Sequence, residues 1–325
     1  MSSTTNINLE LSTEPKSRVS RFCLVALVLL EVGFFGFYGL SRHGNYLTSL
    51  NDLGCFDQAV WGLLHGFPFL ITTFFNEPVS WLGIHFHPVL VFFAPFYLLA
   101  PTVSWLTLAQ AIAIPVAALP LYTFARRVTC SDLAALFWAM TYLSSPFVLS
   151  AASWDFHPVS LAVPLIELAF LAVEEKRFRL LVVCCFLVFL CKEHFGLLAV
   201  GFGLLWLLKH HEPGRAAGLL LLGGGHVYLV MKIVMPAFSP AGQHLMLSGG
   251  QGQLSRYSWL GRSLEEIIAN LLSHPEAIGQ QALVDRGGWI YLLLLLVPLL
   301  CLPLFAPTLL LPGVGDLLAE GIIPV

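Results

Sequence analysis

Long apolar segments alternate with short polar ones along most of the chain. The apolar runs lie near residues 22–40, 86–103, 105–125, 133–151, 158–173, 180–191, 195–208, 216–235 and 290–311. Their apolar residues are continuous rather than alternating, which is typical of membrane helices and not of a transmembrane β-barrel. Since about 20 residues cross the hydrocarbon core as a helix, the shorter runs need flanking residues or a place deep in a bundle. The pattern predicts an all-α, polytopic membrane protein.

The composition supports the same class of protein. Hydrophobic residues make up 57% of the chain and charged residues 11%. A soluble domain of this length could not bury so much apolar surface. The net charge of −3 provides no basic surface for nucleic acid, and the seven cysteines do not have the spacing of a zinc finger or a disulfide framework.

The N-terminal region divides into two parts. Residues 1–20 are polar and rich in Ser and Thr, which predicts a disordered cytoplasmic tail. Residues 21–41 are too long for the core of a signal peptide and lack a small-residue cleavage site, so they predict a retained first span. The helical membrane domain would then comprise residues 21–325.

The segment 86–103 decides the topology, because it contains three prolines and is followed almost directly by the next apolar run. If it crosses the membrane, the basic residues of segments 126–132, 174–179 and 209–215 fall on the outer side. If it is a re-entrant or interfacial helix, those residues become cytoplasmic, together with the basic residues of the N-terminal tail. The positive-inside rule favours the second arrangement, and re-entrant backbone is tolerated where other helices bury it.

We therefore expect about eight spans plus one re-entrant or interfacial helix. The N-terminus would be cytoplasmic, and the long outer loops would be residues 41–104 and 237–289. A bacterial plasma (inner) membrane is the expected location.

Four polar clusters interrupt the apolar chain, and the predicted topology places all of them on the outer face. They are Asn51–Gln58, His85–Pro88, Trp154–Pro158 and Lys192–His194. Ionisable groups beside membrane spans cost free energy to hold, so they usually mark a functional site. We expect their side chains to line one cavity at the membrane boundary.

The aspartates of these clusters are the candidate catalytic residues: Asp52, Asp57 and Asp155. A carboxylate can accept the proton of an attacking hydroxyl group. For Asp52 the alternative is a structural role as the cap of a helix that begins near Leu53.

The histidines suggest a metal site. His85, His87 and His157, together with Asp155, form a plausible ligand set for a divalent metal ion. The alternative is that each His-Pro pair only begins a helix, with proline in its first turn.

Four further residues are candidates for substrate binding: Gln58, Trp61, Lys192 and Glu193. The ammonium group of Lys192 suits a phosphate leaving group. The alternative is that Lys192 and Glu193 form an ion pair at a helix end, where the helix dipole favours a cation.

The order of these motifs resembles a family of uncharacterised bacterial multi-span membrane proteins, defined only as a domain of unknown function. The resemblance covers roughly residues 45–210. The matching residues are Asp52, Leu53, Gly54, Phe56, Asp57, Gln58, Trp61, His85, Phe86, Pro88, Asp155, Phe156, His157, Pro158, Lys192 and Glu193. The family usually continues with further spans, so the end of this chain at Val325 suggests a truncation or a fragment.

The layout also resembles that of GT-C glycosyltransferases. Those enzymes carry an acidic residue in the first outer loop, followed by a surface or re-entrant helix, and a second outer loop supplies more polar residues. The resemblance implies a GT-C-like fold and a membrane glycosyltransferase. Such an enzyme would move a sugar from a polyprenyl-phosphate-linked donor to an acceptor at the outer face.

Two other functions stay open. A secondary transporter would use Glu31 and Glu167, which lie within apolar runs, as intramembrane carboxylates. Paired inverted halves would favour transport, and the sequence has no evident repeat. A scaffold subunit without catalytic activity is the third alternative.

Overall fold

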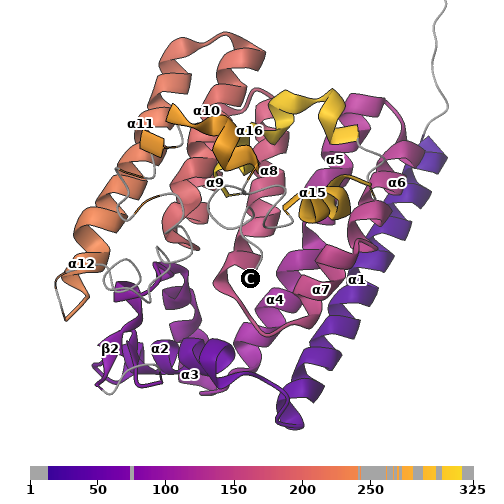
Figure 1. Cartoon of the computed structure of the whole chain (residues 1–325). Helices are drawn as coiled ribbons and strands as arrows, with labels where there is room; N and C mark the ends of the chain where they lie inside the picture. Colours follow the sequence, from indigo (N-terminus) through magenta and orange to yellow (C-terminus); the bar gives the residue numbers. More distant parts are fainter. Residues whose placement is uncertain are drawn as a thin grey trace, which may run out of the picture.

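The computed structural model describes residues 14–73, 77–240 and 242. In the C-terminal part it describes residues 261, 266, 269–270, 273–280, 288–297 and 302–316. Helices dominate this part of the chain, and most of them run side by side in one bundle (Figure 1). The protein is a helical membrane protein. Much of the predicted outer loop 237–289 lies outside the described residues.

The first helix, α1 (Glu14–Gly44), begins inside the segment predicted as a disordered tail. Residues 1–13 lie outside the described residues. The apolar stretch of α1 runs along one side of the bundle and ends at Arg42, His43 and Gly44, close to the first polar cluster (Figure 1).

The chain between α1 and the next long helix stays at one end of the bundle, the lower end in Figure 1. We call it the end segment, residues 45–103. Its elements are short, and two antiparallel strands pair within it through Leu70 and Ser80. The elements are η1 (Leu50–Gly54), α2 (Cys55–Leu64), β1 (Leu70–Ile71), β2 (Val79–Ser80), η2 (Trp81–Gly83), η3 (Pro88–Phe93) and α3 (Ala94–Leu99).

The prolines of the end segment explain why its apolar stretch is short. Pro88 starts the 3₁₀-helix η3, and Pro95 lies in the first turn of α3. The apolar helix Pro88–Leu99 is therefore shorter than a helix that spans a membrane. That segment 86–103 does not cross the bilayer stays a prediction.

The remaining helices form the bundle. They are α4 (Ser104–Val116), α5 (Ala118–Thr129), α6 (Asp132–Leu143), α7 (Pro146–Ser153), η4 (Pro158–Ala162), α8 (Val163–Glu174), α9 (Phe178–Phe189), η5 (Glu193–Phe195), α10 (Gly196–His210), α11 (Pro213–Leu229), η6 (Val230–Val234) and α12 (Met235–Ala237). Beyond them lie α14 (Pro275–Gly279), α15 (Gly288–Leu296), η10 (Leu302–Phe305) and α16 (Pro307–Asp316).

The prediction of about eight spans is wrong for the part of the chain that the structure describes. Three helices there are long and apolar enough to cross a membrane: Arg18–Gly44, Ser104–Thr129 and Pro213–Ala237. A fourth is added if α6 and α7, which meet at a bend of 50°, count as one broken span. Other apolar runs fold as shorter helices such as α8, α9 and α10, because prolines and polar turns interrupt them.

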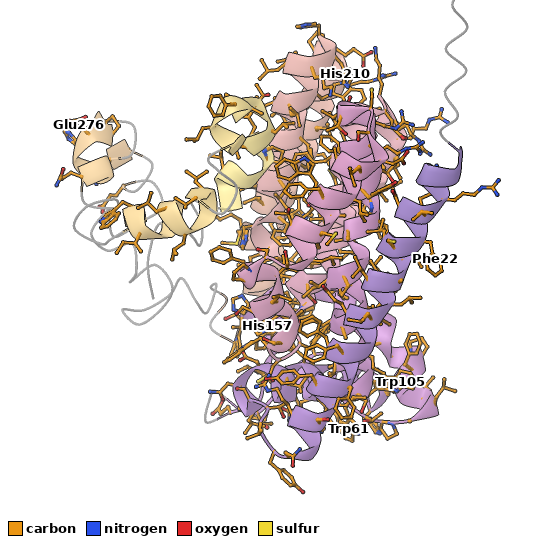
Figure 2. All side chains as sticks on the ribbon, turned by 90° about the vertical axis from the view of Figure 1, so that its right-hand side faces the viewer. Phe22, Trp61, Trp105, His157, His210 and Glu276 are labelled. Atoms are coloured by element: carbon orange, nitrogen blue, oxygen red, sulfur yellow. The ribbon has the colours of Figure 1, made fainter. Side chains whose placement is uncertain are left out.

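Charged residues gather at the two ends of the bundle. At the upper end, Arg127 lies 2.7 Å from Glu175, and Lys176 lies 3.0 Å from Glu212. These ion pairs join the three basic turns of the sequence, segments 126–132, 174–179 and 209–215. The turns lie at the C-terminal ends of α5, α8 and α10. In Figure 2, His210 lies at this upper end, whereas Trp61 and Trp105 lie at the lower end. The structure therefore gathers the basic turns at one end and the end segment at the other.

Candidate functional site

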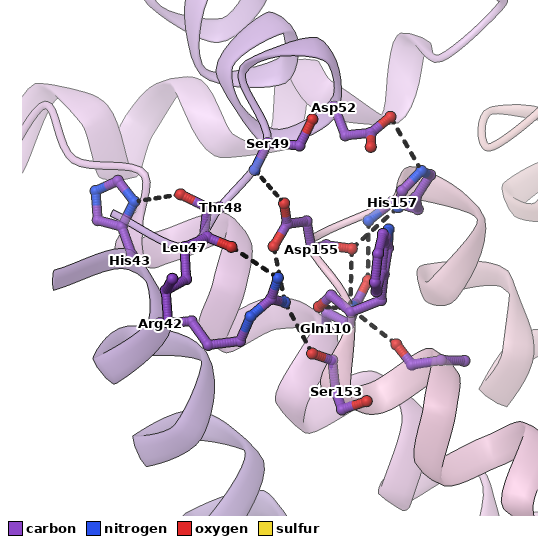
Figure 3. A network of polar contacts seen from close by, with 12 residues as sticks. Arg42, His43, Leu47, Thr48, Ser49, Asp52, Gln110, Ser153, Asp155 and His157 are labelled. Atoms are coloured by element: carbon purple, nitrogen blue, oxygen red, sulfur yellow. Dashed lines mark hydrogen bonds and ion pairs between the residues drawn. The ribbon is translucent and has the colours of Figure 1, made fainter. Parts of the chain in front are cut away.

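A buried ion pair fixes the third polar cluster to the end of α1. Arg42 Nη1 lies 2.9 Å from Asp155 Oδ1, and the Asp155 side chain is only 1% exposed (Figure 3). The same guanidinium group donates to the backbone oxygens of Ser153 and Leu47. The backbone N–H of Ser49 donates to the other oxygen of Asp155. The Arg42–Asp155 pair thus links the end of α1 to the turn after α7.

Gln110, buried in the middle of α4, holds the backbone of this cluster. Its amide nitrogen donates to the carbonyl oxygens of Ala151, Trp154 and Asp155 at 3.0–3.2 Å. Its amide oxygen accepts from the backbone N–H of His157 at 2.9 Å (Figure 3). Sequence reasoning missed Gln110, although a lone glutamine in an apolar run was the available signal, since a buried amide must find partners.

Asp52 and His157 meet above the Arg42–Asp155 pair. Asp52 Oδ1 lies 3.5 Å from His157 Nε2, and the two side chains are 36% and 38% exposed. His157 Nδ1 lies 3.0 Å from the carbonyl oxygen of Asp155. Because a carbonyl oxygen only accepts, Nδ1 carries the hydrogen, and the Nε2 lone pair faces Asp52. The two side chains therefore form an ion pair when Nε2 also carries a hydrogen.

A second polar cluster joins the end segment to the turn after α9. His85 Nδ1 lies 3.0 Å from Glu193 Oε1, and the backbone N–H of Phe86 donates to Oε2 of the same carboxylate at 3.0 Å. Lys192 Nζ lies 3.4 Å from His85 Nδ1 and 3.8 Å from Glu193 Oε1. All three side chains are largely buried.

Opposing effects set the pKa of Glu193. Burial alone raises the pKa, but the hydrogen bond with His85 and the charges of Lys192 and His85 outweigh burial and hold it well below its usual range. Glu193 is therefore an ionised carboxylate that accepts hydrogen bonds from its neighbours, and it is not poised to donate a proton.

His87 lies behind this cluster and is almost completely buried. Its Nδ1 accepts the indole N–H of Trp81 at 2.9 Å, so the imidazole hydrogen is on Nε2. Nε2 has no hydrogen-bond partner among the described residues. Burial, followed by the charges of Lys192 and His85, holds the pKa of His87 well below its usual value. His87, one of the histidines of the predicted metal set, is neutral in the folded protein.

The ring of Phe56 lies between the two clusters. Its centroid is 5.7 Å from that of His87 and 5.8 Å from that of His157. Phe56 also makes an edge contact with Phe156 at 5.7 Å. Polar side chains from segments far apart in the sequence thus lie at one end of the bundle, but as two groups with an aromatic ring between them.

Three predicted site residues have other partners. Asp57 Oδ1 accepts the hydroxyl of Tyr97 at 2.6 Å and lines a cleft of about 370 Å³ together with His43 and Ser49. Gln58 bonds to the backbone and the hydroxyl of Thr72, which fixes the end of β1. Trp61 stacks on His65 with centroids 3.7 Å apart and is exposed.

The predicted metal ligands do not form one set. His85 contacts Glu193, whereas His157 contacts Asp52. Among the residues that the structure describes, no group of three or more His, Cys, Asp and Glu side chains is arranged to hold a metal ion. The donors present among the described residues do not fit the predicted metal.

A cleft of about 500 Å³ adjoins the Asp155–His157 turn. Its polar end is formed by Gln110, Asp155 and His157. Its apolar walls come from α4, α6, α7 and η4, with side chains such as Phe147 and Val159. The cleft therefore combines a polar end beside the Asp52–His157 pair with a lining that suits an apolar chain.

The family described as a predicted membrane protein, DUF2079, matches residues 42–320, and the chain belongs to this family. Comparison with curated proteins and with solved structures gives no significant match.

Proposed function

We propose that this DUF2079 protein is a membrane glycosyltransferase that takes a sugar from a polyprenyl-phosphate donor, with Asp52 as the base. One observation carries the proposal: the cleft beside Asp155 and His157 pairs a polar end with apolar walls. A lipid-linked sugar has the same division, since its phosphate and sugar are polar and its polyprenyl chain is apolar.

The position of Asp52 suits a base. It follows the first spanning helix α1 and directly precedes the short helix α2. Its carboxylate is open to solvent on one side and faces the Nε2 lone pair of His157 on the other. Asp155, by contrast, is buried against Arg42, so we assign it the role of positioning the turn that carries His157.

In the reaction one bond forms, one bond breaks and one proton is transferred. The oxygen of an acceptor hydroxyl group forms a bond to the anomeric carbon of the sugar. The bond from that carbon to the phosphate oxygen breaks, and polyprenyl phosphate leaves with the electron pair. The hydroxyl proton passes to Asp52, where His157 shares it. No step requires a metal or a redox partner.

The proposal also includes the side of the membrane that the site faces. The three basic turns at the upper end favour a cytoplasmic location under the positive-inside rule. The site would then face the outside of a bacterial plasma membrane, where the donor's head group meets the boundary. Lys192 forms an ion pair with Glu193, so its predicted contact with phosphate is not required.

Radiolabel transfer tests the proposal. The full chain in nanodiscs is given undecaprenyl-phosphate-linked ¹⁴C-hexoses, with membranes from cells that lack the protein as the acceptor source. We expect label to leave the lipid fraction, and Asp52→Asn to slow transfer by about 100-fold or more, the usual range for a general base. Glu276→Gln removes a carboxylate far from the site (Figure 2) and should leave transfer unchanged.

Two outcomes contradict the proposal. Absence of transfer from every hexose donor by folded protein would reject glycosyl transfer. A loss in Asp57→Asn that exceeds the loss in Asp52→Asn would move the base to Asp57.

The transporter alternative has one supporting observation. Oε2 of Glu31, on the spanning helix α1, is buried and has no hydrogen-bond partner among the described residues. If Glu31 serves transport, Glu31→Gln would stop proton-coupled flux in proteoliposomes and leave sugar transfer intact. The two functions can therefore be separated by experiment.

A further inference from the structure

The upper end of the bundle carries another, unrelated cleft. It has a volume of about 700 Å³ and lies between the N-terminal half of α1 and the turn that joins α5 to α6. Three arginines line it, Arg21, Arg126 and Arg127, and Asp132 is the acidic residue of the lining. The cleft lies at the opposite end from Asp52 and His157, so the proposed transfer reaction does not use it.

The arginines keep donors available to a ligand. Arg126 uses Nε to contact Asp132 at 2.8 Å, and Arg127 uses one terminal nitrogen to contact Glu175 at 2.7 Å. Their side chains nevertheless remain 42% and 54% exposed. A guanidinium group has five N–H donors in a planar fork, so each can bind a phosphate oxygen in addition to its carboxylate partner.

The walls of this cleft are apolar and belong to spanning helices. Leu24 and Val25 come from α1, and Leu119 comes from α5. Both helices belong to stretches that are long enough to cross a membrane, Arg18–Gly44 and Ser104–Thr129. The arginines lie toward the ends of these stretches, so the cationic part of the cleft lies at the level of lipid head groups.

We propose that this cleft binds an anionic phospholipid, of which phosphatidylglycerol is the test case. The phosphate would lie against Arg21, Arg126 and Arg127, and an acyl chain would follow Val25 and Leu119 toward the hydrocarbon. The apolar walls favour a lipid over free phosphate, because inorganic phosphate has no surface that they could bury. The positive charge favours an anionic lipid over a zwitterionic one.

Native mass spectrometry of the full chain in detergent tests this site. Dioleoyl phosphatidylglycerol, dioleoyl phosphatidylcholine and inorganic phosphate are titrated separately. We expect one tightly held phosphatidylglycerol, and roughly fivefold weaker binding for each of Arg21→Gln and Arg127→Gln, from the usual effect of one basic side chain. Arg215→Gln is the control, since it removes an equally exposed charge that pairs with Glu212 outside the cleft.

Each arm of the experiment has an outcome that overturns the proposal. Equal binding of phosphatidylcholine would show that charge is not recognised. Displacement of the lipid by millimolar inorganic phosphate would assign the site to free phosphate. Unchanged binding in both arginine variants, with thermal unfolding confirming that they are folded, would place the lipid elsewhere.

Discussion

Arg42 and Asp155 form a buried ion pair that joins the end of α1 to the turn after α7. Asp155 is 1% exposed and Arg42 is 16% exposed, and their nearest nitrogen and oxygen atoms are 2.9 Å apart. Removing one partner of such a pair leaves a charge buried without compensation. Since the turn held by Asp155 also carries His157, this pair supports the position of the proposed base.

Breaking the pair should destabilise the protein. We expect Asp155→Asn and Arg42→Met each to lower the free energy of unfolding by about 3–5 kcal/mol. The double variant Arg42→Met with Asp155→Asn should lose less stability than the sum of the two single variants, because neither charge is then left alone. Thermal unfolding in detergent measures the cycle. A double variant as unstable as the sum of the two single variants would contradict a direct coupling.

The buried histidine His87 predicts a dependence of stability on pH. Its pKa in the folded protein lies well below the usual 6.5, chiefly because of burial and then the charges of Lys192 and His85. Below pH 6.5 the unfolded chain therefore binds a proton that the folded chain does not. Stability falls as the pH is lowered, by about 1.4 kcal/mol per pH unit from this group.

His87→Asn should remove this contribution, since asparagine can still accept from Trp81 and does not titrate. Thermal unfolding of both proteins between pH 7.5 and 5.0 supplies the comparison. The wild-type melting temperature should fall more steeply than that of the variant. Parallel profiles would mean that His87 is not the titrating group.

Two adjacent glycines of α11 provide a matched test of helix packing. A Cβ added at Gly223 would lie 2.2 Å from the backbone oxygen of Gly196 on α10, whereas a Cβ at Gly224 meets no atom within 4 Å. We expect Gly223→Ala to cost about 1–3 kcal/mol through overpacking, and Gly224→Ala to be neutral or mildly stabilising in a helix. Melting temperatures distinguish the two, and equal effects would argue against the close approach of α10 and α11.

Native Cys130 reports the side of the membrane. Among the cysteines that the structure describes, Cys130 is the exposed one, and it lies in the turn between α5 and α6. We expect a membrane-impermeant maleimide to label it only after cells are permeabilised. Tyr46→Cys, at a fully exposed position of the opposite end, should be labelled in intact cells.

The labelling experiment requires Cys23 and Cys301 to be replaced by serine, so that Cys130 gives the signal. Labelling of Cys130 in intact cells, together with protection of Tyr46→Cys, would reverse the proposed orientation. The proposed site would then face the cytoplasm.

The amino-acid sequence alone is enough to identify a helical membrane protein and the residues worth attention. Continuous apolar runs specify membrane helices because the hydrocarbon core leaves no other partner for backbone polar groups. The three prolines of segment 86–103 indicated a short helix, since proline interrupts the hydrogen-bonding ladder. The scarcity of charge also made the four polar clusters conspicuous. These are local properties, which residue type and spacing encode directly.

The number of runs long enough to span, and the choice of polar groups that meet, depend on the three-dimensional arrangement. Nothing in the spacing distinguishes Asp52, Asp57 and Asp155, yet one faces His157, one accepts from Tyr97 and one is buried against Arg42. Such pairings depend on contacts between distant segments, for which chemically equivalent carboxylates are interchangeable in a sequence. The ring of Phe56, which lies between His87 and His157, is fixed only by packing in three dimensions.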